Sequence, residues 1–131
     1  MKKIGVVLGE FHKSLVAQML EEARIVAYEA ELEIVDEVWV PGSVEKPLAI
    51  KRLLDKGVDG VVVLGIIEKG ETQHGFVMGQ ALMQTVMNLQ VEYGKPISLG
   101  VLGPGIEHHQ IEVRLKPYAH KAVHAVAHML S

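Results

Sequence analysis

A run of apolar residues that ends in a glycine-rich loop constrains the fold of this chain more than any other feature. Val61 to Leu64 are four apolar residues, three of them β-branched, and Gly65 follows directly. This pattern predicts a strand that is buried on both faces, as strands of a parallel sheet are. The segment then continues through a loop to His74, and a helical pattern begins near Phe76.

The loop from Gly65 to His74 has the composition of an anion site. Its glycines leave backbone N–H groups accessible, and the following helix adds the positive end of its dipole, so the loop predicts a site for a phosphate or another anion. His74 adds a group that gains and loses a proton near neutral pH. An ordinary turn with a surface histidine is the alternative interpretation, and the loop alone does not decide between them.

Strands and helices are expected to alternate along the whole chain. Acidic residues interleave with apolar ones in the second strand, which predicts an edge strand with one wetter face. Ser14 is expected to cap the first helix, and Pro117 to begin the last one. The expected strands are Ile4–Gly9, Leu32–Val40, the apolar run from Val61, and Ile97–Leu102. The expected helices are one that follows Ser14, Val44–Lys56, one from near Phe76 to Tyr93, Glu107–Leu115 and Pro117–Leu130.

This alternation predicts one α/β domain over residues 1–131, with a parallel sheet and helices on both faces. Ligands of such sheets bind outside the carboxyl ends of the strands. The four loops there provide an aromatic ring, a carboxylate, glycine turns and a histidine, which favours a ligand site. These loops are Gly9–Phe11, Pro41–Glu45, Gly65–His74 and Gly103–Gly105.

Composition excludes several classes of protein. The 131 residues are 49% hydrophobic and 22% charged, which is typical of a single globular domain. A net charge of −3 with dispersed basic residues argues against a nucleic-acid partner. No apolar run is long enough for a membrane span, and Met1–Lys3 leads into a strand rather than a signal peptide. The absence of cysteine excludes a disulfide scaffold and is typical of a cytoplasmic protein.

A stripe of histidines near the end of the chain raises the question of a metal site. His120, His124 and His128 are spaced by four residues, and one such pair can hold zinc. Eight helical residues span about 12 Å, so the three cannot reach one ion. No acidic residue lies between His120 and His124 to act as a base. A solvated or subunit-facing stripe is the favoured interpretation, and no metal is expected.

Five groups of residues fall in the order seen in one enzyme family. They are Gly9–Phe11, Val40–Ala49, Leu64–Gly65 with Gly70–His74, Pro96–Gly100, and Arg114. Through them nearly the whole chain resembles the 6,7-dimethyl-8-ribityllumazine synthases, most of all the short archaeal form. Archaeal riboflavin synthase shares the Val-Pro-Gly and Pro-Leu-Ala elements and is the alternative, but the Gly-Glu-Thr-Gln-His loop favours the lumazine enzyme.

The resemblance implies a flavodoxin-like three-layer fold and a transferase of riboflavin biosynthesis. Such an enzyme condenses 5-amino-6-(D-ribitylamino)uracil with 3,4-dihydroxy-2-butanone 4-phosphate and needs no metal or organic cofactor. It also implies a homo-oligomer, either a pentamer or a cage of twelve pentamers, whose sites are shared between neighbours. Riboflavin synthase stays open as a further partner. A non-catalytic lumazine- or flavin-binding homologue and a structural shell protein are the remaining alternatives.

The resemblance also assigns roles to individual residues. His74 is implied as the general acid and base, and Arg114 as a phosphate contact from the adjacent subunit. Val44 and Leu99 stand where the family often has phenylalanine, and either His120 or Lys121 matches a family lysine near the phosphate. The residues implied in substrate binding are Phe11, Ser43, Val44, Glu45, Ile66, Ile67 and Leu99, and those implied in phosphate binding are Gly70, Glu71, Thr72 and Arg114.

Overall fold

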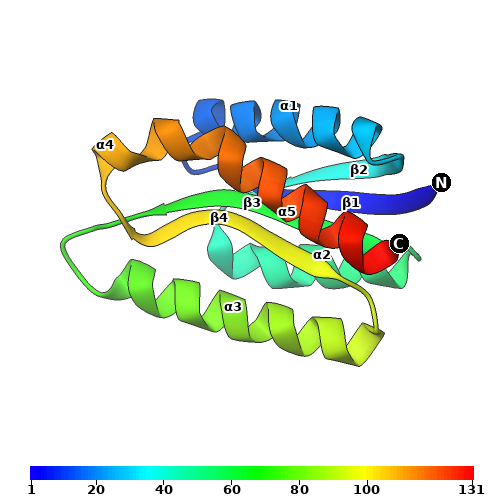
Figure 1. The fold of residues 1–131 in the computed structure, drawn as a ribbon. Helices are drawn as coiled ribbons and strands as arrows, with labels where there is room; N and C mark the ends of the chain where they lie inside the picture. The colour runs from blue at the N-terminus through cyan, green and yellow to red at the C-terminus, as the bar shows by residue number, and fades with distance from the viewer.

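The computed structural model describes residues 1–131 as one parallel four-stranded sheet between two layers of helices (Figure 1). The strand order is β2-β1-β3-β4, and every neighbouring pair is parallel. The strands are β1 (Lys2–Gly9), β2 (Leu32–Val40), β3 (Gly60–Glu68) and β4 (Ile97–Ile106). The helices are α1 (Lys13–Glu29), α2 (Lys46–Asp55), α3 (His74–Tyr93), α4 (His108–Ile111) and α5 (Leu115–Leu130), with 3-10 turns at Ser43–Glu45 and Glu112–Arg114.

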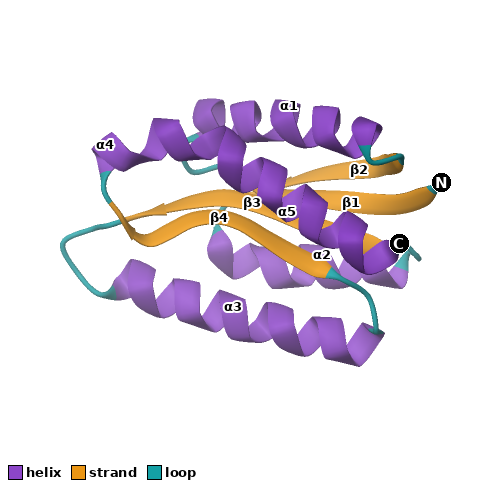
Figure 2. Ribbon diagram, viewed as in Figure 1, coloured by secondary structure: helices purple, strands orange, loops and turns teal.

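Strand β3 lies between β1 and β4 and is buried from Gly60 to Ile67, so the prediction of a doubly buried strand is confirmed. Its side chains alternate between two cores. Val62 and Leu64 face the core formed with α1 and α5, whereas Val61 and Val63 face the core formed with α2 and α3. The same two layers are visible on either side of the sheet (Figure 2).

Strand β2 lies at one edge of the sheet and is mostly half-buried, as the interleaved acidic residues predict. Because all strands are parallel, the loops that follow them meet at a single edge, and this expectation is also confirmed. We refer to it below as the carboxyl edge of the sheet. Both chain termini lie at the opposite end (Figure 1). No helix combines the length and apolar character needed to cross a membrane.

The start of α1 differs from the prediction. Ser14 does not cap this helix, because the helix begins one residue earlier, at Lys13, and His12 occupies the capping position. His12 has a left-handed backbone with φ of 55°, and its carbonyl oxygen accepts hydrogen bonds from the N–H groups of Leu15 and Val16.

Other boundaries also differ. The expected helix Val44–Lys56 begins as a 3-10 turn and becomes α-helical only at Lys46. Strand β4 continues through the expected turn Gly103–Gly105, because Ile106 pairs with Glu68 at the end of β3. The expected helix Glu107–Leu115 is a single turn followed by a 3-10 turn. Pro117 is the third residue of α5 rather than the first, which the helix tolerates because N–H groups of a first turn have no intrahelical partner.

The extended end of β4 generates a first prediction. Gly103 has φ of 93°, and a Cβ atom there would overlap the carbonyl oxygen of Ile67, which is fixed in β3. Gly105 has φ of 88° but open space around it, so it provides a matched control. We expect Gly103→Ala to lower the free energy of unfolding by about 3 kcal/mol and Gly105→Ala by about 1 kcal/mol. Urea denaturation measures both, and equal losses would contradict the steric argument.

Candidate functional site

A cavity of about 410 Å³ opens at the carboxyl edge, over the ends of β1 and β3. The connection after β1 leads to β2 on one side of the sheet, and the connection after β3 leads to β4 on the other side. The cavity therefore lies where the connections diverge, which is the point at which parallel α/β sheets bind ligands. It is lined by Phe11, Pro41, Gly42, Ser43, Val44, Glu45, Ile66, Ile67, Glu68, Gly70, Thr72, His74, Gly75 and Met78. A hollow of about 460 Å³ on the outer side of β2 and α2 includes Glu45 but no other expected site residue.

The cavity brings together most of the residues that the sequence suggests. The side that follows β1 and β2 contains Phe11, Ser43, Val44 and Glu45. The side formed by the end of β3 and the segment after it contains Ile66, Ile67, Gly70, Thr72 and His74. Phe11 is 55% exposed, so its ring is accessible to a ligand. These residues lie at or after the carboxyl ends of three strands, and parallel pairing of the strands places them at one opening.

Three expected residues lie outside this cavity. Glu71 lines a neighbouring groove formed by the loop after β3 and Gly105. Leu99 is half-buried against the core between the sheet and helices α2 and α3. The Arg114 guanidinium donates a hydrogen bond of 2.9 Å to the carbonyl oxygen of Gln110. Within one subunit these three side chains therefore do not line the space around His74.

His74 is the first residue of α3, two residues earlier than the helical pattern suggests. Its backbone N–H donates to the Thr72 hydroxyl at 3.3 Å, which ties the loop after β3 to the helix. The free N–H groups and the dipole of the first turn attract negative charge to this end of the cavity. An imidazole beside an anion-attracting helix end can transfer protons to and from a bound ligand.

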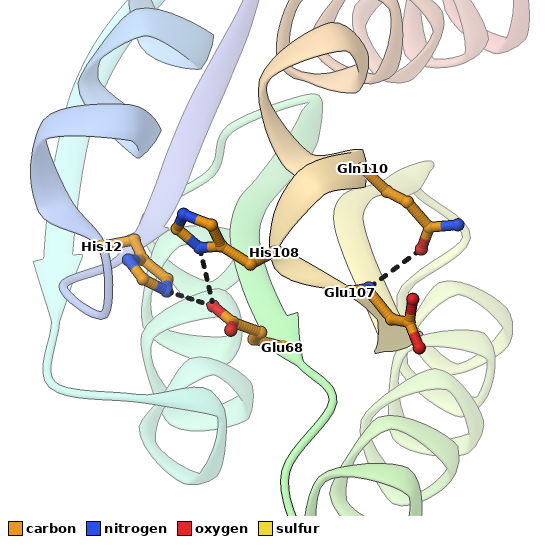
Figure 3. A network of polar contacts seen from close by, with 5 residues as sticks. All are labelled: His12, Glu68, Glu107, His108 and Gln110. Atoms are coloured by element: carbon orange, nitrogen blue, oxygen red, sulfur yellow. Dashed lines mark hydrogen bonds and ion pairs between the residues drawn. The ribbon is translucent and has the colours of Figure 1, made fainter.

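Sequence reasoning missed Glu68, which lines the cavity, and His12, which contacts Glu68. Their side chains form a hydrogen bond of 2.7 Å between Glu68 Oε1 and His12 Nε2, and both are about a quarter exposed. His108 Nδ1 lies 3.9 Å from the same oxygen (Figure 3). Glu68 and His12 are 56 positions apart, so no local pattern in the sequence predicts that they pair. The only local sign is that Glu68 is the first charged residue after the apolar run of β3.

Lys46 is a third missed residue and the only charged side chain that is almost completely buried, at 2% exposure. It begins α2 and lies against Gly9 and Gly65 at the carboxyl edge. A Cβ atom at Gly9 would lie 3.2 Å from Lys46 Cε, and one at Gly65 would overlap its Nζ. No carboxylate lies within ion-pair distance, and burial lowers the pKa of the Lys46 ammonium from 10.5 to about 8.

The C-terminal histidine stripe lies on α5, away from the cavity. The rings of His120 and His124 are 4.4 Å apart, and His120 Nδ1 is 3.5 Å from a carboxylate oxygen of Glu22 on α1. No three side chains of His, Asp or Glu are grouped so that they could hold a metal ion.

Comparison with known proteins gives one consistent result. The sequence model of the family described as 6,7-dimethyl-8-ribityllumazine synthase matches residues 1–131. The chain is similar to proteins of that name from Staphylothermus marinus, at 40% identity over all of this chain and 88% of that protein, and from Methanoculleus marisnigri, at 37% over 98% and 95%. The protein of that name from Saccharolobus solfataricus is 37% identical over 94% of this chain and 80% of its own length.

Among solved structures, a de novo designed Rossmann-fold protein aligns with a TM-score of 0.43 and 18% identity, over 91% of this chain and 98% of that one.

The burial of Lys46 generates a second prediction. Its pKa of about 8 in the folded state lies below the ordinary 10.5, so the unfolded chain binds more protons between these values and the stability of the protein rises with pH there. Replacement by methionine removes a cost of about 3 kcal/mol at pH 7. We expect Lys46→Met to be more stable than the wild type by about this amount at pH 7, and the advantage to shrink steadily between pH 8 and 10.5.

Urea denaturation at several pH values measures this difference. Lys116→Met is a matched control, because Lys116 is exposed on α5 and its replacement should give a curve parallel to that of the wild type. A constant difference between Lys46→Met and the wild type across this pH range would show that the buried amine does not titrate as described.

Proposed function

Because the chain belongs to the 6,7-dimethyl-8-ribityllumazine synthase family, we propose that it catalyses the formation of 6,7-dimethyl-8-ribityllumazine in riboflavin biosynthesis. The substrates are 5-amino-6-(D-ribitylamino)uracil and 3,4-dihydroxy-2-butanone 4-phosphate. The observation that carries the proposal is the convergence of the residues matched to the family in a single cavity at the carboxyl edge. The cytoplasm is the expected compartment, since the chain has no cysteine.

The pyrimidine substrate is proposed to lie on the Phe11 side of the cavity. An exposed phenylalanine offers a flat apolar face on which a heterocycle can stack. The ribityl chain would extend along Ser43, Val44 and Glu45, where the carboxylate of Glu45 accepts hydrogen bonds from hydroxyl groups. Ile66 and Ile67 form the apolar floor between the two ends of the cavity.

The phosphate of the second substrate is proposed to bind at the start of α3. Gly70 and Thr72 line this end, and the helix dipole favours an anion there. Glu71 would contribute its backbone N–H only, because its side chain lines a separate groove. No lysine or arginine of the same subunit lines the cavity, and Arg114 of a second subunit is the residue proposed to supply a cation.

An assembly of identical subunits is therefore part of the proposal. Helix α3 exposes apolar side chains over several turns, an arrangement typical of a surface that another subunit covers. The large apolar side chains that are exposed on it are Phe76, Val77, Met83, Met87 and Val91. A pentamer, alone or in a cage of twelve, brings Arg114 of one subunit near the cavity of the next, and Leu99 would contribute in the same way. Riboflavin synthase is the further partner that such a cage would accommodate.

His74 is proposed to move the protons of the reaction. The amine of the pyrimidine adds to the ketone, and water leaves as the imine forms at C2. A proton is then removed from C3 as phosphate leaves C4, and ring closure expels a second water. Each step transfers a proton near neutral pH, for which imidazole is suited. A phosphate held at Gly70 and Thr72 places the neighbouring carbon close to His74, and much of the acceleration comes from holding both substrates together.

The direct test is incubation of the purified protein with both substrates, with the lumazine product followed by its absorbance. We expect product only when both are present and no riboflavin from the lumazine alone. Conversion of the lumazine would instead identify a riboflavin synthase, and binding without product would identify a non-catalytic homologue.

The role of His74 generates a third prediction. His74→Ala should lower kcat by about a hundredfold while the variant still assembles and binds the pyrimidine, since positioned acid–base groups contribute about 10²–10⁴-fold. His109→Ala is the matched control, because His109 is exposed and lies outside the cavity. Full activity of His74→Ala would remove the histidine from the mechanism, and failure to assemble would make it a structural residue.

Arg114 generates a fourth prediction. Arg114→Ala should raise KM for the butanone phosphate about ten- to a hundredfold and leave KM for the pyrimidine unchanged, as expected for loss of one charge-assisted hydrogen bond. Mixed assemblies of Arg114→Ala and His74→Ala subunits should recover about one native site in four, since subunits pair at random. Light scattering that found only monomers, or no recovery on mixing, would contradict an Arg114 contributed by a neighbour.

A further inference from the structure

The charge of the cavity lining is one-sided. Glu45 and Glu68 place two carboxylates at the opening, and no lysine or arginine of the same subunit lines it. Ionised carboxylates only accept hydrogen bonds. The cavity therefore favours a ligand with N–H and O–H donors, and Glu68 has no role among the residues assigned so far.

One oxygen of Glu68 is already engaged, and the other is not. Oε1 accepts the hydrogen bond from His12 Nε2 at 2.7 Å and is the atom nearest to His108 Nδ1, at 3.9 Å. Oε2 has no hydrogen-bond partner in the protein. His12 lies at the start of α1 and His108 lies in α4, so both contacts to the Glu68 carboxylate come from outside strand β3 (Figure 3).

The position of His12 links this carboxylate to the ring-binding side of the cavity. The His12 ring lies 4.3 Å from the ring of Phe11, centroid to centroid, and its backbone is fixed by two hydrogen bonds at the start of α1. A heterocycle that stacks on Phe11 presents its edge to the groups beside that ring. Through His12, the carboxylate of Glu68 is connected to the Phe11 side of the cavity.

We propose that Glu68 binds the N–H donors at the edge of the pyrimidine substrate and that His12 positions its carboxylate for this contact. The inference rests on the proposed function, because it names the substrate group that this carboxylate meets. A carboxylate binds N–H donors strongly and repels phosphate, so the Glu68 end of the cavity favours the pyrimidine over the butanone phosphate. Glu68 is thus a specificity-determining residue for the nitrogen-containing substrate.

The experiment compares Glu68→Leu, Glu68→Gln and His12→Asn with the wild type. For Glu68→Leu, KM for the pyrimidine and its dissociation constant by calorimetry should rise about ten- to a hundredfold, while KM for the butanone phosphate stays constant. Glu68→Gln keeps a neutral acceptor and should recover part of the loss. His12→Asn tolerates the left-handed backbone and should raise the pyrimidine KM about threefold to tenfold without changing kcat.

Glu107→Gln is the matched control, because Glu107 belongs to the same polar cluster but does not line the cavity (Figure 3). A ring-N-methylated pyrimidine sharpens the test: its binding should be weaker than that of the parent pyrimidine in the wild type and equal to it in Glu68→Leu. An unchanged pyrimidine affinity in folded Glu68→Leu and Glu68→Gln, or a loss confined to the butanone phosphate, would overturn the inference.

Failure of the proposed function gives a different result. The wild type would then form no lumazine from the two substrates, whatever residue stands at position 68. Calorimetry with the pyrimidine alone needs no turnover, so in that case the Glu68 variants would still decide whether this carboxylate recognises N–H donors.

Discussion

The burial of β3 on both faces is the constraint on which the rest of the structure depends. A strand without a solvent-facing side requires helices above and below the sheet. Parallel pairing with β1 and β4 also requires each connection to carry the chain from the carboxyl edge of the sheet back to its amino end. The loops that follow the strands then have only one place to meet. The cavity with Phe11, Glu45 and His74 is a consequence of this topology, because no two of these residues are close in sequence.

The sequence predicts the parts of this arrangement that depend on local periodicity. The strands, the order of strands and helices, the wetter edge strand and the convergence of loops all follow from apolar spacing and glycine positions. Features decided by contacts between distant segments could not be predicted. Strand β4 continues past Gly103 because Ile106 finds a partner in β3, and Glu68 meets His12 from a different strand. In the sequence, Lys46 is like any charged residue in a first helical turn. The structure shows that Gly9 and Gly65, which have no Cβ atom, leave the space that its side chain occupies.

Charge makes the single subunit an incomplete site for the proposed reaction. Its cavity contains two carboxylates and an imidazole, whereas the phosphate substrate needs positive charge beyond a helix dipole. The same subunit exposes apolar side chains on α3 and keeps Arg114 on a 3-10 turn outside its own cavity. A contact between subunits would cover the apolar side chains of α3, and the same contact would bring Arg114 to the cavity of a neighbour. Folding and catalysis would then depend on the same interface.

Unusual backbone conformations have different causes at the two ends of the sheet. At the amino end, the residues with positive φ are Glu31, Gly57 and Gly94, and each follows the end of a helix, where a left-handed residue satisfies terminal carbonyl groups. At the carboxyl edge, His12 precedes a helix and Gly103 and Gly105 lie within a strand, so helix termination explains none of them. The buried ammonium of Lys46 lies at this edge as well. Departures from local preference that helix termination does not explain therefore gather at the carboxyl edge, where the cavity lies, and a stable core elsewhere can offset their cost.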